Sequence, residues 1–437
     1  MAIRSGQPVL YYISNVKRVK MPEIINLSKQ IEKQLPAETA RLLKTAGELA
    51  QSQQQRLYLV GGMVRDLLLE RNNLDLDLVV EGDAIHLAEE LADMNQAKVT
   101  KHPRFGTAKI QCDSMYIDVA TARAETYARP GALPTVKPGT IGDDLSRRDF
   151  TINAMATELS PRHFGELLDP HNGRNDLEHK LVRILHERSF IDDATRIWRA
   201  VRYEQRLDFQ MELATTELLK QSTVWLSTVS GDRIRHELEL VLKEEHPEKA
   251  LRRADELGVL NDLHPSLRGD IWLTETYALA REENLPDMPS PPLYLALLAY
   301  RLTAVEIEQL ISYLNLPKTT AQILKDTIAL KGNLEELSAH GLSPSHIYSL
   351  LHGYSTTAVI ANALATDNDT IEEHIELYLN VLRYVHSSLK GDDIKRLGVR
   401  AGPKIREILN TLREAKLDGK VSGKKEEEEM VRGILVK

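Results

Sequence analysis

The sequence predicts an α+β protein in which a small head of mixed strands and helices is followed by a long, all-helical region. Residues 56–182 combine short apolar runs of strand length with helical segments. From Leu185 onward, apolar residues recur at three- and four-residue spacing, which is the period of amphipathic helices. A chain of 437 residues is also too long for one ordinary core, so we expect several domains.

The composition is that of a globular protein, with 42% hydrophobic and 27% charged residues. No apolar run has the length of a membrane span, and the N-terminus does not begin a signal segment, so we expect no membrane partner. The single cysteine, Cys112, excludes an internal disulfide and points to the cytoplasm. The net charge of −8 gives no support to nucleic-acid binding, but residues 390–437 carry 13 Lys and Arg against 9 Asp and Glu.

The head begins with a strand, a glycine turn and a short helix. After helical spacing in residues 1–55, the apolar run Leu57–Val60 ends at Gly61-Gly62, and Met63–Leu69 has helix-forming composition. Gly62 would let the backbone approach a phosphate, with the helix dipole behind it. For a lone glycine pair, an ordinary strand-to-helix turn is the better interpretation. The pattern is neither a GxGxxG nor a Walker motif, which disfavours Rossmann and P-loop folds.

Three acids are candidate metal ligands. Asp75 and Asp77 fall in the next strand candidate and share one of its faces, because side chains alternate along a strand. Asp118, in the strand candidate Met115–Ala120, could be a third carboxylate. Mg²⁺ prefers carboxylate oxygens together with substrate phosphates. Taken alone, two acids on a strand are more often solvent-facing.

Arginines near these acids are candidate phosphate ligands. Arg65 is placed either to contact a phosphate or to pair with Asp66. Arg147 and Arg148 offer forked donors for a triphosphate, and Asp149 could buttress an arginine. Alone, the second group could equally begin an amphipathic helix with solvated arginines.

Three other segments complete the head. Residues 84–94 read as a helix, and 107–110 read as a strand. Residues 127–142 contain three prolines and three glycines, which predicts a loop with little structure of its own.

The segment 192–206 predicts a helix with one packed and one basic side. An acid and an arginine one turn apart can read the edge of a base by paired hydrogen bonds, while further arginines hold phosphates. In isolation, a salt-bridged surface helix is the simpler interpretation. The residues predicted to share the polar side are Asp193, Arg196, Arg199 and Arg202.

In the helical region, breaks are expected at 231–232, 246–247, 284–292, 316–317 and 401–403. Pro403 lies near the first position of a helix that could present backbone amides to an RNA phosphate. The acidic run Glu426–Glu429 is expected to be a solvated helix face.

Together these stretches resemble the class II tRNA nucleotidyltransferases and bacterial poly(A) polymerases, a branch of the polymerase-β-like nucleotidyltransferases. The motifs follow the family's order across residues 56–265, and the run RRDFTINAMA is highly specific. The matching motifs are Gly61–Asp66 with Asp75–Asp77, His102–Thr107, Arg147–Ala156, Leu168–Gly173, Asp193–Arg202 and Ser230–Leu238.

The resemblance implies template-independent addition of CMP and AMP to the 3′ end of tRNA from CTP and ATP, with release of pyrophosphate. It implies two catalytic Mg²⁺ ions on Asp75 and Asp77, with Asp118 as the third acid. The nucleotide would be bound by Gly62, Arg65, Arg148, Asp193, Arg196, Arg199 and Arg202. The implied divisions are an N-terminal helical extension (1–55), a nucleotidyltransferase head (56–184), a helical neck (185–270) and a tRNA-binding body and tail (271–437).

The sequence departs from the family at Asp192, where a glutamate is usual, and at His171-Asn172, within the family's Asp-Pro-Phe-Gly-Gly motif. Four alternatives remain open: an A-adding or CC-adding enzyme, a poly(A) polymerase, a catalytically silent RNA-binding protein, and a small-molecule nucleotidyltransferase. DNA is not an expected partner.

Overall fold

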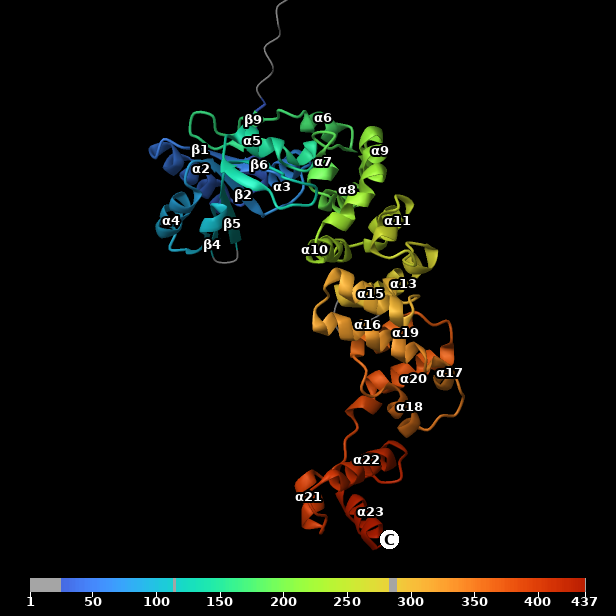
Figure 1. Ribbon diagram of the computed structural model, residues 1–437. Helices are drawn as coiled ribbons and strands as arrows, with labels where there is room; N and C mark the ends of the chain where they lie inside the picture. Colours follow the sequence, from blue (N-terminus) through green and yellow to red (C-terminus); the bar gives the residue numbers. More distant parts are fainter. Residues whose placement is uncertain (1–24, 113–114, 283–288, 437) are drawn as a thin grey trace, which may run out of the picture. The chain divides into compact units, whose positions relative to one another are not determined.

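The computed structural model describes residues 25–112, 115–282 and 289–436. The chain divides into two compact units. The first unit consists of Met1–Ala124 and Val136–Leu177, and the second of Glu125–Thr135 and Glu178–Lys437. The predicted α+β class is confirmed, because a mixed sheet with its helices makes up the first unit and the second is almost entirely helical (Figure 1).

The first unit is built on a seven-stranded sheet with the order β3-β4-β5-β2-β1-β8-β9. β2 and β5 pair in parallel, and the other neighbours pair antiparallel. The four strands predicted from the sequence are confirmed as β1, β2, β4 and β5. The strands are β1 (Arg56–Val60), β2 (Leu76–Glu81), β3 (Lys98–His102), β4 (Thr107–Cys112), β5 (Met115–Thr121), β8 (Ala156–Glu158) and β9 (Leu167–Leu168).

Helices cover the sheet of the first unit. α2 packs against β1, and α4 packs against β4 and β5. α5 covers β2, where Ile141 and Leu145 join a core with Tyr58, Val60 and Val79. The helices are α1 (Ser28–Gln34), α2 (Ala37–Ser52), α3 (Gly62–Leu68), α4 (Ala84–Met94), α5 (Ile141–Ser146), α6 (Gly173–Glu178), η1 (Pro103–Phe105) and η2 (Thr151–Asn153).

The expectation of an unstructured loop over 127–142 is wrong in its second half. β7 (Thr135–Pro138) pairs with β6 (Arg123–Thr126) in a two-stranded sheet, an edge position that tolerates proline. A capping box on Thr140 then starts α5. The intervening arm Glu125–Thr135 belongs to the second unit, where a Cβ on Gly131 would lie 2.5 Å from the Thr228 carbonyl oxygen.

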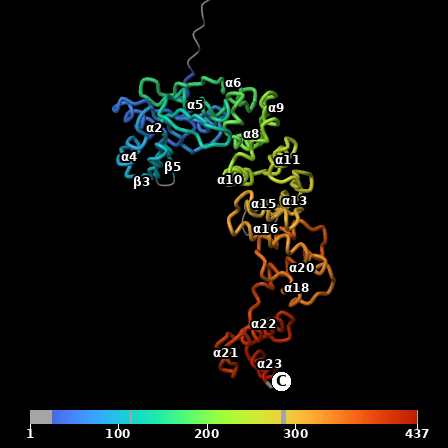
Figure 2. The backbone as a smooth tube through the Cα atoms, in the orientation of Figure 1, coloured from blue at the N-terminus to red at the C-terminus, as the bar shows by residue number. Residues whose placement is uncertain are grey.

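The second unit is a succession of helices that follow one another in chain order (Figure 2). Four predicted breaks coincide with helix starts at Gly231, Pro247, Lys318 and Pro403. The fifth, at 284–292, lies largely outside the described residues, and its described end meets the start of α14 at Pro291. The elements are β10 (Leu181–Val182), α7 (Ser189–Asp192), α8 (Thr195–Leu207), β11 (Gln210–Met211), α9 (Leu213–Ser222), η3 (Thr223–Thr228), α10 (Gly231–Leu242), α11 (Pro247–Glu256), α12 (Val259–Leu263), α13 (Ile271–Glu282), α14 (Pro291–Leu298), α15 (Ala304–Leu314), α16 (Lys318–Lys331), α17 (Leu334–Leu337), α18 (Pro344–Leu351), α19 (Thr356–Leu364), α20 (Asp369–Asn380), η4 (Leu382–Tyr384), α21 (Gly391–Arg396), α22 (Pro403–Leu417) and α23 (Lys424–Val436).

Separate cores hold these helices. α8 packs against α10 and α11 and buries Trp198 completely. A second core lies among α16 to α20 and includes Leu351 and Ile375, and a third joins α21, α22 and α23 around Ile394 and Leu412. None of the helices in the described ranges is long and apolar enough to cross a membrane.

The expectation that Glu426–Glu429 forms a solvated face is wrong for one residue. Glu427 is fully buried, and its carboxylate accepts hydrogen bonds from the backbone N–H groups of Ser388 (2.9 Å) and Leu389 (2.8 Å). A run of four residues exceeds one helical turn, so one of its members must face inward.

Candidate functional site

The candidate metal ligands lie at the start of β2. Asp77 is its second residue, and Asp118 of β5 lies directly beside it in the parallel register. Asp75 precedes the strand, where its N–H donates to Asn73 Oδ1 (2.9 Å). Burial, together with the charges of Asp75 and Asp118, raises the pKa of Asp77 to about 6, although Arg148 opposes the shift. This accumulation of negative charge is the environment that a divalent cation would relieve.

Asp118 is held differently from the other two acids. It lies opposite Lys109 in the antiparallel β4–β5 register, and its Oδ2 is 3.1 Å from Lys109 Nζ. In the described part of the chain, no three acidic, histidine or cysteine side chains are arranged to hold a metal. The structure therefore does not assemble a three-carboxylate site, and Asp118 as a metal ligand stays a prediction. Asp75 and Asp77 fit a Mg²⁺ ion whose other ligands are substrate phosphates and water.

The glycine turn adjoins the arginines of the sequence motif. Gly61 has a φ of +69°, which favours glycine, and a Cβ there would lie 2.6 Å from Arg148 Nη1. The Arg148 guanidinium is held by Asp144 Oδ2 (3.0 Å). Its Nε is buried and has no hydrogen-bond partner within the described ranges. A phosphate at this turn would supply the missing acceptor.

Sequence reasoning gave no role to Asp144, although it is fully buried and orients both arginines of the motif. Arg147 Nη2 lies 2.6 Å from Asp144 Oδ1, while Arg148 bonds the other carboxylate oxygen. These ion pairs could have been predicted from the sequence, because Asp144 precedes the two arginines at i,i+3 and i,i+4 spacing.

Arg65 is bound inside the first unit. Its Nε and Nη2 donate to the two carboxylate oxygens of Asp66 at 2.8 and 2.9 Å, and its Nη1 donates to Asn153 Oδ1 at 2.7 Å. The Asn153 side chain in turn donates to Asp149, so Asp149 supports Arg65 indirectly, through the amide of Asn153. The pairing with Asp66 is confirmed, whereas a direct contact between Arg65 and phosphate stays a prediction.

In the second unit, Asp193 and Arg196 are fixed by neighbouring groups. The expectation that Asp193 lies on the helix is wrong. α8 begins at Thr195, and Asp193 is extended (φ −141°) with its Oδ1 accepting from Thr195 Oγ1 at 2.7 Å. This local turn is typical of aspartate before a helix. Asp193 also pairs with Arg233 (2.8 Å), and Arg196 Nη1 donates to Ser189 Oγ (2.8 Å).

Arg199 and Arg202 have carboxylate partners on α10 and beyond it. Arg199 Nη1 lies 3.7 Å from Glu237, and Arg202 Nη1 lies 3.4 Å from Glu244. The pKa of the Glu237 carboxyl is raised, mainly by burial, despite the two arginines. Sequence reasoning missed these partners, because the motif containing Arg233 and Glu237 was matched without a role for either residue.

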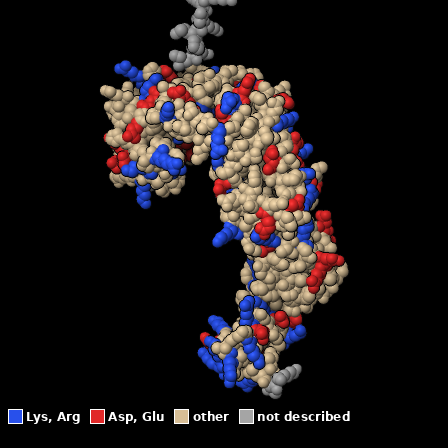
Figure 3. All heavy atoms as spheres, in the orientation of Figure 1, with Lys and Arg blue, Asp and Glu red and all other residues tan. Residues whose placement is uncertain are grey.

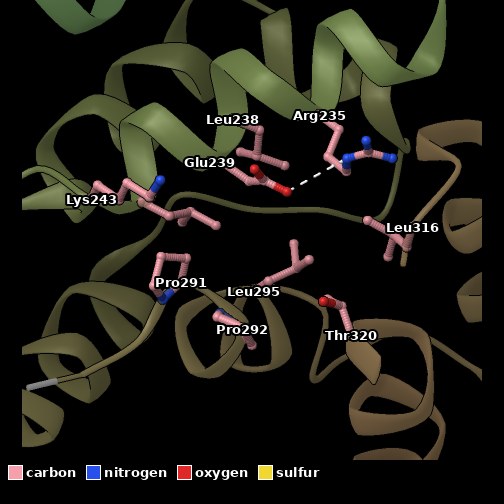
Figure 4. A pocket seen from close by; sticks show the side chains of 10 residues that line it. Arg235, Leu238, Glu239, Lys243, Pro291, Pro292, Leu295, Leu316 and Thr320 are labelled. Carbon is pink, nitrogen blue, oxygen red and sulfur yellow. Dashed lines mark ion pairs between the residues drawn. The ribbon is translucent and has the colours of Figure 1, made fainter. Parts of the chain in front are cut away.

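Each unit has a cavity that could be compared with the predicted site. One of about 740 Å³ in the first unit is lined by Leu74, Asp75 and Tyr116 and by α2. The other, of about 220 Å³, lies between α10 and α14 in the second unit (Figure 4). Its walls are largely apolar, and its Arg235 and Glu239 pair with each other (3.5 Å). It contains none of the predicted site residues.

Comparison with known families gives two matches. The poly(A) polymerase head domain matches residues 57–183. A second family, described as the probable RNA and SrmB-binding site of polymerase A, matches residues 208–270.

Individual proteins extend the similarity along the chain. The A-adding tRNA nucleotidyltransferase of Halalkalibacterium halodurans is 32% identical over 92% of this chain and 94% of its own length. The enzyme of the same name from Geobacter sulfurreducens is 33% identical over 97% of this chain, which spans half of that protein. The Thermotoga maritima CCA-adding enzyme complexed with tRNA has a TM-score of 0.75 at 31% identity, covering 95% of this chain and all of the other.

Proposed function

Because this chain belongs to the tRNA nucleotidyltransferase and poly(A) polymerase family, we propose that it adds C and A nucleotides to tRNA 3′ ends without a template, using CTP and ATP. The observation that carries this proposal is similarity along nearly the whole chain to enzymes that act on tRNA, in both the head and the helical part. For a tRNA substrate we propose a cytoplasmic location.

In the proposed reaction, the 3′-hydroxyl oxygen of the RNA attacks the α-phosphorus of the nucleotide. A new P–O bond forms, and the bond to pyrophosphate breaks. Members of this family depend on divalent metal ions, and Asp75 and Asp77 would hold two Mg²⁺ ions in this chain. The metal supplies charge neutralisation at the phosphates and favours the ionised hydroxyl. Arg148, oriented by Asp144, would grip the triphosphate at the glycine turn.

Base choice is proposed to rest on Asp193 and Arg196. A carboxylate and a guanidinium together offer acceptors and donors for the Watson–Crick edge of one base. Asp193 is fixed by Thr195 and Arg233, and Arg196 by Ser189, so both groups are positioned before a nucleotide arrives. Because these side chains are preorganised, they can select the incoming base, which in template-dependent polymerases is selected by the template strand.

Addition of A alone is the second candidate, because two relatives that match this chain over 92% or more are A-adding enzymes. The test uses tRNA transcripts that end before the CCA sequence, after C, or after CC, each incubated with CTP, ATP or both. CCA addition predicts extension of all three. Incorporation of A only, and only after CC, would establish the second candidate.

A catalytically silent RNA-binding protein predicts tRNA binding without incorporation under any nucleotide condition. Retained tRNA binding by the unmodified chain separates this alternative from an inactive preparation, and the Asp75→Ala variant tests the metal assignment. It should abolish incorporation while leaving tRNA binding unchanged, and unchanged incorporation would contradict the metal assignment.

A further inference from the structure

A polar cavity of about 250 Å³ lies between α18 and α22 of the second unit, remote in sequence from every residue assigned above. From α18 and its end, side chains at i, i+3, i+4 and i+7 line one wall. From α22, side chains at i, i+4, i+7 and i+8 line the other. The lining residues are Ser345, Tyr348, Ser349, His352, Arg406, Asn410, Arg413 and Glu414.

Two stacked rings form one wall of this cavity. The centroids of Tyr348 and His352 are 4.6 Å apart, and the ring planes differ by 17°. Tyr348 is buried, whereas His352 is exposed, so the stack ends in a flat imidazole face that reaches solvent. Burial and the charge of Arg413 lower the pKa of His352, which favours the neutral form of the ring. A neutral, preordered ring is a platform on which a nucleobase can stack.

Arginines supply the opposite wall. Arg413 Nη1 donates to the Tyr348 hydroxyl (2.7 Å), while its buried Nε has no partner in the described part of the chain. Arg406 is exposed on the same face of α22, about two turns before Arg413. With Glu414 as the single acid, the cavity carries a net positive charge. Space-filling spheres show lysine and arginine gathered on the C-terminal helices that include α22 (Figure 3).

We propose that this cavity binds one nucleotide unit of the RNA substrate, with a base stacked on His352 and a phosphate beside Arg406. The volume is below that of most drug-sized ligand sites, which suits a single base rather than a duplex segment. The cavity between α10 and α14 also carries one more cation than acid, but its walls are largely apolar and its lining has no aromatic ring on which a base could stack. This inference rests on the proposed function, since it identifies a contact with that substrate.

The test measures the dissociation constant of the full-length chain for tRNA lacking its 3′ CCA, at several salt concentrations. His352→Ala should weaken binding about fivefold or more through lost stacking, with an unchanged salt dependence. His352→Phe should restore it, because a flat ring returns. Arg406→Ala should weaken binding and reduce the slope of log Kd against log salt by about 1. Lys404→Ala, an exposed cation on α22 outside the lining, is the matched control and should have less effect than Arg406→Ala.

Unchanged tRNA affinity in His352→Ala would overturn the proposal, as would equal weakening by Lys404→Ala and Arg406→Ala. Free AMP and CMP are tested against the same variants. Loss of mononucleotide binding with intact tRNA binding would assign the cavity to free nucleotides and overturn the assignment to RNA. Absence of incorporation by the unmodified chain would contradict the proposed function but leave this binding comparison valid.

Discussion

The candidate site residues of the two units differ in whether their charges are paired within the protein. In the first unit, Asp75 and Asp77 accumulate negative charge at the start of β2, and Arg148 keeps a buried donor without a partner in the described ranges. In the second unit, Asp193 has an arginine partner, and Arg202 has a carboxylate partner. We infer that the charge at Asp75 and Asp77 is completed by ligands, whereas Asp193 is oriented in advance by an arginine of its own unit.

The largest expected effect is on the first unit's acids. Asp77→Asn should reduce nucleotide incorporation by roughly a thousandfold, because metal-assisted charge stabilisation accounts for several kcal/mol. Binding of Mn²⁺ followed by electron paramagnetic resonance should weaken in parallel. Asp192→Asn, in the second unit, is a control acid that pairs with exposed Arg188 and should retain incorporation. Normal Mn²⁺ binding in Asp77→Asn would contradict the comparison.

Arg148→Lys should lower kcat/KM by roughly a hundredfold, because lysine retains the charge but loses the forked donors. The effect should appear for CTP and ATP alike, since phosphates are common to both. The control is Arg147→Lys, which changes the other arginine bound to Asp144. An equal loss in both variants would indicate that Asp144 pairing, rather than phosphate contact, is what matters.

Acid should inhibit incorporation through Asp77. Its pKa of about 6 is raised, so the carboxylate becomes protonated and loses metal as the pH falls through 6. Between pH 7 and pH 5 the ionised fraction of Asp77 falls roughly tenfold, and the Mg²⁺ concentration for half-maximal rate should rise accordingly.

The stability of the metal-free protein should change with pH in the opposite direction to its activity. A raised carboxyl pKa means that the metal-free protein gains stability from this group below pH 6 and loses it as the pH rises. Thermal melts of metal-free protein should show this trend, and Asp77→Asn should remove it.

Arg233→Ala should alter selectivity more than rate, because Arg233 holds the proposed base-selecting Asp193. We expect the ratio of kcat/KM for the preferred and competing nucleotides to fall about fivefold, from the loss of an oriented hydrogen-bonding pair. Arg235→Ala, two residues along α10 and paired with Asp232, is the matched control. A uniform loss for both nucleotides would assign Arg233 a purely structural role.

The smallest effect should be purely one of stability. Glu427→Ala removes two buried hydrogen-bond acceptors and should reduce the free energy of unfolding by about 1–3 kcal/mol, with catalysis at low temperature unchanged. Urea unfolding measures this loss. Glu429→Ala, exposed on the same helix, should have no comparable effect.

The sequence predicted those features that depend on neighbouring residues. Runs of strand length located β1, β2, β4 and β5, and prolines and glycines located the starts of α10, α11 and α22. Failures came where distant groups decide the structure. Asp193 leaves the helix to bond Thr195, and its partner Arg233 lies forty residues away. Glu427 faces inward because its carboxylate accepts hydrogen bonds from the backbone N–H groups of Ser388 and Leu389. Neither the pairing of Asp193 with Arg233 nor the hydrogen bonds of Glu427 can be predicted from the residues next to them in the sequence.

The assignment of Glu125–Thr135 to the second unit also bears on how the protein can be divided. The chain passes between the units at 124–125, 135–136 and 177–178, so neither unit is one continuous segment. Splitting the gene after residue 177 would leave an eleven-residue piece of the second unit attached to the first. Two such halves, produced separately and mixed, should reassemble through that piece. A break in the chain after Leu177 therefore tests whether this piece is enough to join the two parts.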